Sequence, residues 1–181
     1  VVTSVAEHNS VLRPLRQLEA TRDVTLTLVD VDEAGFFAAT DVEKAIRPET
    51  QLVILQHASN VTGAIQPIDD VAAITDKHSV SFAIDAAQTA GHVPLNVEQL
   101  GADFVACSGH KGLMGPLGTG LLYVAAGQEK DLMPTRQGGT GSRSEVDTQP
   151  ESMPDRYESG NHNAPGLVGL DAALGFILKK G

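Results

Sequence analysis

Short runs of apolar residues alternate along the chain with longer segments whose apolar positions recur every three or four residues. The short runs are rich in β-branched residues and predict strands, whereas the longer spacing predicts helices with one apolar face. Strands are expected at 1–6, 24–30, 51–56, 80–85, 103–108 and 120–124. Helices are expected at 9–20, from Thr40 to near Pro48, and at 68–77, 97–100 and 167–178.

The later predicted strands are continuously apolar instead of alternating, and helices separate most of them. This pattern predicts an α/β fold, with a mostly parallel sheet that carries helices on both faces. Asn9 or Ser10 is expected to cap the first helix, and Thr40 with Glu43 matches a capping box that opens the second.

The stretch from Arg136 to Asn163 differs from the rest, because it is rich in Gly, Ser, Pro and charged residues. It is expected to be a long functional loop or a segment that contacts another subunit. Within it, Arg156 and Glu158 could form an ion pair or bind a ligand. The first residues and the apolar helix at 167–178 both resemble the interior of a longer protein, so we expect the chain to be part of one.

Composition narrows the possible partners. The 181 residues include 23 acidic and 13 basic side chains, for a formal charge of −10, which argues against nucleic acid as a partner. One cysteine excludes an internal disulfide and a multi-cysteine zinc site. The six histidines lack metal-site spacing, so no metal is expected. No apolar run approaches the roughly 18 residues of a membrane helix and no signal peptide is evident, so we expect a cytoplasmic protein without a membrane partner.

Polar clusters follow four of the predicted strands. They are Glu7–Asn9, His57–Asn60, Asp85–Gln88 and Ser108–Lys111. Ligands of an open α/β sheet bind beyond the carboxyl ends of the strands, so these clusters predict one site at one sheet edge.

Two residues in these clusters suggest the chemistry. Lys111 lies in a glycine-flanked turn after a strand; it is either a solvated loop lysine or an amine that forms a Schiff base in a partly desolvated pocket. Asp85 is either a cap for the next segment or a carboxylate that pairs with the ring nitrogen of pyridoxal phosphate. In the second case Gln88 could reach the ring hydroxyl, and Ala87 could lie flat against the ring.

Taken together in this order, the motifs resemble the class V aminotransferase family of pyridoxal-phosphate enzymes, and most closely its cysteine desulfurase and selenocysteine lyase branch. The resemblance covers essentially the whole chain. The stretches that carry it are Glu7–Ser10, His57–Gly63, Asp85–Gln88, Ser108–Lys111 and Arg156–Asn163.

The resemblance implies catalytic roles for Lys111 and His8. Lys111 would form the Schiff base with pyridoxal 5'-phosphate and, once freed, abstract the proton at the α-carbon. His8 would stack on the cofactor ring and assist proton transfer, while Ala87 would back the ring on its other side. Asp85 would pair with the pyridinium nitrogen.

The remaining cofactor contacts implied by the resemblance are polar. Asn60 and Gln88 would bind the ring hydroxyl region, and Ser108 and His110 would hold the phosphate. In the desulfurase branch a threonine reaches the phosphate of the neighbouring subunit's cofactor. Here Asn161 stands at that position, and its amide can still donate a hydrogen bond. Thr140, further upstream, offers another donor.

The family also implies an architecture and an activity. Residues 1–181 would be the central part of the large domain of a type I pyridoxal-phosphate transferase, truncated so that the N-terminal arm and the small C-terminal domain are absent. The whole enzyme would be a homodimer that removes sulfur or selenium from a cysteine-type amino acid and passes it to an acceptor protein. Its nucleophilic cysteine would lie outside this chain, because Cys107 belongs to a buried strand.

Two alternatives stay open. One is a class V aminotransferase, epimerase or lyase that acts on another amino acid. The other is a non-catalytic folded module, since the chain as it stands lacks family contacts to substrate and phosphate and is expected to be inactive on its own.

Overall fold

The computed structural model describes residues 1–180 and contains one sheet with the strand order β2-β1-β3-β4-β5-β6. The strands are β1 (Val2–Ser4), β2 (Thr27–Val29), β3 (Leu52–Gln56), β4 (Ser81–Asp85), β5 (Phe104–Ser108) and β6 (Gly120–Val124). All neighbouring pairs from β2 to β5 are parallel, and β6 is antiparallel to β5. The predicted α/β fold with a mostly parallel sheet is therefore confirmed.

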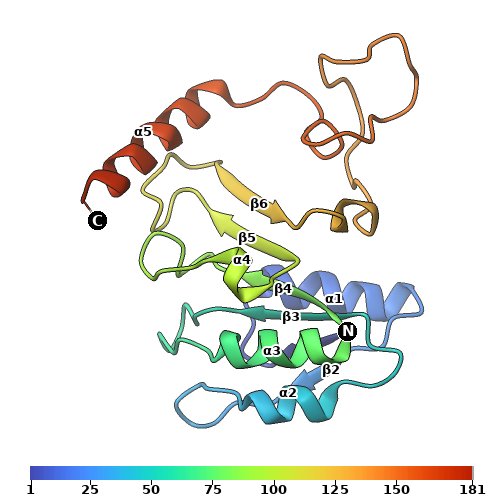
Figure 1. Ribbon diagram of the computed structural model, residues 1–181, viewed down its shortest axis with the longest axis vertical. Helices are drawn as coiled ribbons and strands as arrows, with labels where there is room; N and C mark the ends of the chain where they lie inside the picture. The colour runs from blue at the N-terminus through green and yellow to red at the C-terminus, as the bar shows by residue number, and fades with distance from the viewer. Residues whose placement is uncertain (181) are drawn as a thin grey trace.

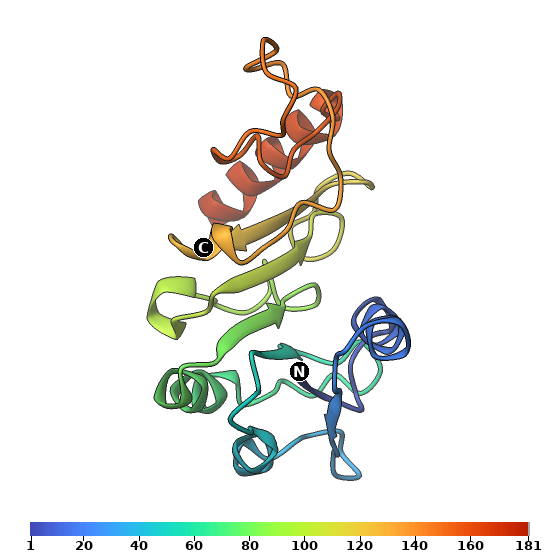
Figure 2. The same cartoon turned by 90° about the vertical axis from the view of Figure 1, so that its right-hand side faces the viewer.

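Helices lie on both faces of this sheet, as Figures 1 and 2 show. They are α1 (Asn9–Thr21), α2 (Ala39–Ala45), α3 (Ile68–His78), α4 (Val97–Leu100) and α5 (Ala164–Lys180), with a short 3-10 turn, η1 (Gln128–Lys130). Helix α1 covers one face, and α2, α3 and α4 cover the other. Among residues 1–180, no helix combines the length and the apolar character needed to cross a membrane.

The core is divided between these two faces. The larger cluster contains Val42, Val71 and Phe82, which join α2 and α3 to the middle of the sheet. The smaller cluster joins Val11 and Leu15 of α1 to the opposite face. Alternating strand residues point to opposite faces, so each central strand contributes to both sides. Among the helices of residues 1–180, α1 alone packs on this face, near β1 and β3, and the same face over β4, β5 and β6 is open.

The strand at 120–124 departs from the expectation that a continuously apolar strand is buried. The segment 120–124 is as apolar as a core strand, yet Leu121 is 48% and Leu122 is 52% exposed. Within the described residues β6 pairs only with β5, so it lies at the edge of the sheet. Composition alone does not distinguish an apolar edge strand from a buried one.

The helix starts also differ from the predicted caps. The N-cap of α1 is His8, whose side chain accepts a hydrogen bond from the Ser10 backbone N–H, so neither Asn9 nor Ser10 is the cap. Helix α2 begins at Ala39 and its N-cap, Ala38, makes no side-chain hydrogen bond. Thr40 lies inside the first turn, which makes the predicted capping box wrong.

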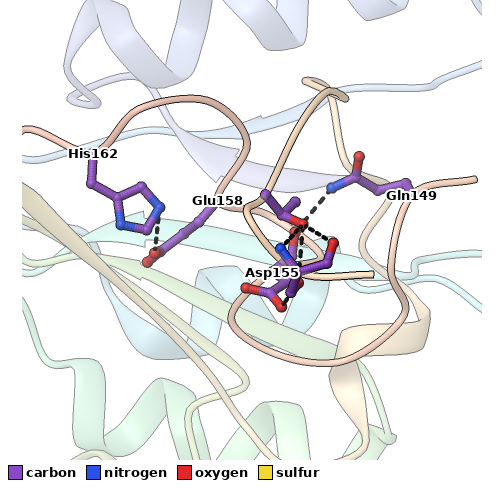
Figure 3. A network of polar contacts seen from close by, with 6 residues as sticks. Gln149, Asp155, Glu158 and His162 are labelled. Carbon is purple, nitrogen blue, oxygen red and sulfur yellow. Dashed lines mark hydrogen bonds and ion pairs between the residues drawn. The ribbon is translucent and has the colours of Figure 1, made fainter. Parts of the chain in front are cut away.

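The segment 136–163 contains no helix or strand, as expected, but side-chain contacts hold it in shape (Figure 3). Gln149 Nε2 donates to the Asp155 carbonyl at 2.9 Å. His162 Nε2 lies 3.5 Å from Glu158 Oε2, whereas the expected Arg156–Glu158 ion pair does not form. Arg156 instead lies over the ring of Tyr157.

Candidate functional site

A cavity of about 820 Å³ opens on the α1 side of the sheet. Most of its polar lining comes from the predicted clusters, namely His8, Asn60, Asp85, Gln88, Ser108, His110 and Lys111, and Ser10 and Gln56 lie next to them in the sequence. Its apolar wall includes Ile54, Ala83, Phe104 and Leu122, which are strand residues of the open face. The cavity therefore has a polar end at the carboxyl ends of β3, β4 and β5 and an apolar floor along the sheet.

The structure brings eight of the nine predicted site residues to this cavity. They are His8, Asn60, Asp85, Ala87, Gln88, Ser108, His110 and Lys111. Parallel strands all end at the same sheet edge, so residues far apart in the sequence meet there. The ninth, Asn161, is exposed and does not line the cavity. Thr140 donates to the Ser142 carbonyl at 3.0 Å within its own loop.

His8 joins the end of β1 to the start of α1. Its Nδ1 accepts the Ser10 backbone N–H at 3.1 Å and lies 2.8 Å from Ser10 Oγ. A ring nitrogen that accepts a backbone N–H carries no proton, so the neutral imidazole has its proton on Nε2. The helix cap thus sets the tautomer of His8 and leaves an N–H donor on the other ring nitrogen.

Asp85 combines both of the roles considered for it. Its Oδ1 accepts the Ala87 backbone N–H at 2.9 Å and so caps the turn after β4. Among the ion pairs of residues 1–180, none involves Asp85, and its side chain is half-buried beside the cavity. The carboxylate keeps an oxygen, Oδ2, for a cationic N–H donor in the cavity.

Lys111 is held in a tight turn after β5. The Gly109 N–H donates to the Thr119 carbonyl at 2.9 Å, and the Met114 N–H donates to the Lys111 carbonyl at 2.9 Å. A Cβ on Gly112 would collide with the Ala90 carbonyl oxygen, so this position requires glycine. The half-buried Lys111 makes no ion pair among the described residues, so no carboxylate holds its amine away from the cavity.

Two buried polar side chains near this edge were not predicted as special. Glu7 is 5% exposed and desolvation raises its pKa to about 7, with a smaller contribution from the Asp85 charge. His57 is also 5% exposed, and desolvation lowers its pKa, so it is neutral. The only signal in the sequence was their place at the ends of predicted strands, which does not show whether a polar side chain points inward.

Cys107 lies in β5 and packs against the larger core cluster. It also borders the cavity. Burial raises the pKa of its thiol, and the Asp85 charge raises it further. A thiol with a raised pKa is a poor nucleophile at neutral pH. The expectation that Cys107 is a core residue holds only in part, because its side chain is half-buried and borders the cavity.

The donor set of the cavity fits pyridoxal phosphate. Lys111 supplies a primary amine for the aldehyde, and Asp85 keeps a carboxylate oxygen for the ring nitrogen. Ser108 and His110 add polar groups on the same wall, where a phosphate could be bound. Among residues 1–180, no group of three or more His, Cys, Asp or Glu side chains is arranged to hold a metal ion.

Comparison with known proteins gives a consistent result. The family model described as Aminotransferase class-V matches residues 1–181. A probable cysteine desulfurase of Pyrococcus abyssi is 36% identical over 187 aligned residues, covering 100% of this chain and 45% of the relative. The cysteine desulfurase IscS of Dictyoglomus turgidum is 34% identical, covering 96% of this chain and 40% of the relative.

A solved structure is similar in both fold and sequence. The apo structure of a cysteine desulfurase from Thermococcus onnurineus NA1 superimposes with a TM-score of 0.87 at 34% identity. The match covers 98% of this chain and 45% of that structure. The chain therefore spans less than half the length of the relatives it matches.

Proposed function

Because the chain belongs to the class V aminotransferase family, we propose that the whole protein is a pyridoxal-phosphate-dependent cysteine desulfurase or selenocysteine lyase. The observation that carries this proposal is the meeting of Lys111, Asp85 and His8 in one cavity. Similarity to cysteine desulfurases over nearly the whole chain supports the choice of sulfur chemistry.

Each of these three side chains has a role that follows from its surroundings. When bound, pyridoxal phosphate withdraws electrons from the α-carbon of an amino acid. Lys111 would hold the cofactor through its amine and, once freed, would take the α-proton; none of the ion pairs among residues 1–180 involves it. Asp85 Oδ2 would accept a hydrogen bond from the ring nitrogen. His8 would cover the ring and offer its Nε2–H to the bound groups.

Other residues of the cavity would orient the cofactor. Asn60 and Gln88 would bind near the ring hydroxyl, Ala87 would leave room for the ring, and Ser108 with His110 would hold the phosphate. Asn161 lies on an exposed loop, so its expected contact would be to the cofactor of a second subunit. A homodimer, a cytoplasmic location and a sulfur-accepting partner protein remain predictions.

Desulfuration also needs a nucleophile that takes the sulfur atom from the substrate. Cys107 does not suit this role, because it is half-buried in a strand and its thiol has a raised pKa. We therefore propose that the nucleophilic cysteine is outside residues 1–181.

The test is reduction with borohydride in the presence of pyridoxal phosphate, followed by peptide mapping of the whole protein. We expect one reduced adduct, on Lys111, and a strongly diminished yield in Asp85→Ala. An adduct spread over exposed lysines would contradict the proposed site. Sulfide release from cysteine, compared with amino transfer to a 2-oxo acid, then distinguishes a desulfurase from an aminotransferase.

A further inference from the structure

Glu7 is a buried acid directly behind the cavity. It is 5% exposed, whereas the adjacent His8 is exposed. Burying a carboxyl group costs free energy unless its oxygens have partners, so its presence here requires a reason. Glu7 does not line the cavity, and it therefore acts on the site through other residues.

Hydrogen bonds of Glu7 and of its neighbour Ala6 tie the turn between β1 and α1 to the sheet. Ser4 Oγ donates to Glu7 Oε1 at 2.8 Å and accepts the Ala6 backbone N–H at 3.2 Å. Gln56 Nε2, from the end of β3, donates to the Ala6 carbonyl at 2.6 Å. The turn that leads into His8 is thus anchored to both β1 and β3.

The second carboxyl oxygen of Glu7 makes the ionised form costly. Oε2 is buried and has no hydrogen-bond partner among the described residues. Desolvation raises the pKa of Glu7 to about 7, although hydrogen bonding to Gln56 and Ser4 opposes this rise. A protonated carboxyl keeps its acceptor for Ser4 and avoids a buried charge beside Asp85.

We propose that Glu7 is a positioning residue of this site, which fixes the placement of His8 by anchoring the turn between β1 and α1. Within residues 1–180 the hydrogen bonds of the His8 side chain are all to Ser10, a residue of its own helix, so its position at the cavity depends on the backbone that precedes it. The inference deepens the proposed function and rests on it, because His8 matters through the cofactor that it covers.

The experiment compares four variants of the whole protein by two measurements. The first is the dissociation constant for pyridoxal phosphate, and the second is amide hydrogen exchange over residues 8–12 in the apoprotein. Glu7→Leu removes the acceptor for Ser4, and Ser4→Ala removes the donor. Glu7→Gln preserves the shape and hydrogen bonding of the neutral acid. Val71→Ala creates a cavity in the other core cluster and serves as the destabilised control.

We expect Glu7→Leu to weaken cofactor binding about tenfold, Ser4→Ala to act in the same direction, and both to accelerate exchange over residues 8–12. Glu7→Gln is expected to stay within about twofold of wild type in binding, as is Val71→Ala. A folded Glu7→Leu protein with wild-type affinity and exchange would overturn the inference; if that variant does not fold, Ser4→Ala decides in the same way. Absence of cofactor binding by the wild type would overturn the proposed function, whereas the exchange comparison tests the anchoring of the turn without cofactor.

Discussion

At the scale of single residues, the site depends on side chains that serve the fold and the chemistry together. His8 caps α1 through Nδ1 and for that reason presents Nε2–H at the cavity. Asp85 caps a turn with one oxygen and keeps the other for a ligand. Such double use restricts substitution, because a replacement must satisfy both the backbone and the ligand.

Glu7 gives the chain a pH-dependent stability. Its pKa rises from 4.5 to about 7 on folding, so folding takes up a proton between these values and stability falls as the pH rises through them. Between pH 4 and pH 8 we expect the free energy of unfolding of the wild type to fall by about 3 kcal/mol on account of Glu7, and this fall to be absent in Glu7→Gln. Urea unfolding of both proteins at several pH values measures this. Parallel curves for wild type and variant would contradict the assignment.

Cys107 is expected to be dispensable for sulfur chemistry. Burial raises the pKa of its thiol, so little thiolate is present at neutral pH. In the whole protein, Cys107→Ser should therefore keep sulfide release from cysteine within about twofold of wild type. A loss of a hundredfold or more, with cofactor binding retained, would show that Cys107 is the nucleophile.

At the scale of elements, the ends of the helices determine local stability. The C-cap of α3 is Ser79, which has a φ of 54°, and the C-cap of α4 is Gly101, which has a φ of 64°. Both residues adopt the left-handed conformation, which glycine adopts at little cost and other residues do not. In the same backbone conformation, glycine can therefore be introduced at Ser79 and removed at Gly101.

We expect Ser79→Gly to stabilise the chain and Gly101→Ala to destabilise it, each by about 1 kcal/mol. No atom lies within 4 Å of a Cβ placed on Gly101, so its cost would come from the backbone alone. Thermal unfolding should show the two melting temperatures moving in opposite directions. A gain from both substitutions would contradict the backbone explanation.

The turn that carries Lys111 packs closely against the turn after β4. A Cβ on Gly112 would meet the Ala90 carbonyl and would lie 2.6 Å from His92 Cδ2. We expect Gly112→Ala to destabilise the chain by about 2 kcal/mol and to reduce trapping of pyridoxal phosphate on Lys111. The measurements are urea unfolding and yield of the borohydride-reduced adduct.

Gly175→Ala is the matched control for Gly112→Ala, because a Cβ there has open space and lies inside α5. It should stabilise the helix by up to about 1 kcal/mol without changing the adduct. Equal effects of the two substitutions would contradict the packing argument.

At the scale of the whole molecule, the open edge and the open face of the sheet expose neighbouring apolar side chains. Within the described residues β6 pairs on one side only, and Leu121 and Leu122 are about half-exposed. Apolar edge strands promote pairing between chains. We expect the 181-residue chain to self-associate with increasing concentration, and Leu121→Lys to reduce this. Sedimentation velocity measures it, and identical behaviour of both chains would contradict the role of the edge.

Much of this architecture could be predicted from the sequence, because apolar runs and helical spacing are local signals. The segments Val97–Leu100 and Gly120–Val124 were predicted with the bounds that the structure has. The site could also be located, because ligands bind beyond the carboxyl ends of parallel strands, which all lie at one sheet edge. Eight of the predicted residues line one cavity there. Their individual roles in binding and catalysis remain predictions.

What could not be predicted depends on contacts between distant segments. Glu7 appeared to be an ordinary polar residue at a strand end, and its burial follows from Ser4 and from the approach of β3. The exposure of Leu122 follows from the place of β6 in the sheet order. His8 was missed as a helix cap because imidazole caps a helix only when its ring nitrogen turns toward the backbone.

The strand order has a consequence for how the cavity forms during folding. β1 lies between β2 and β3, and the cavity joins His8, which follows β1, to Lys111, which follows β5. Helices and the local β5–β6 hairpin form early, because their contacts are close in sequence, whereas parallel pairing across long crossovers is slow. The ability to bind a ligand therefore arises at the end of refolding. Ligand binding then measures completion of the sheet, whereas helical content does not.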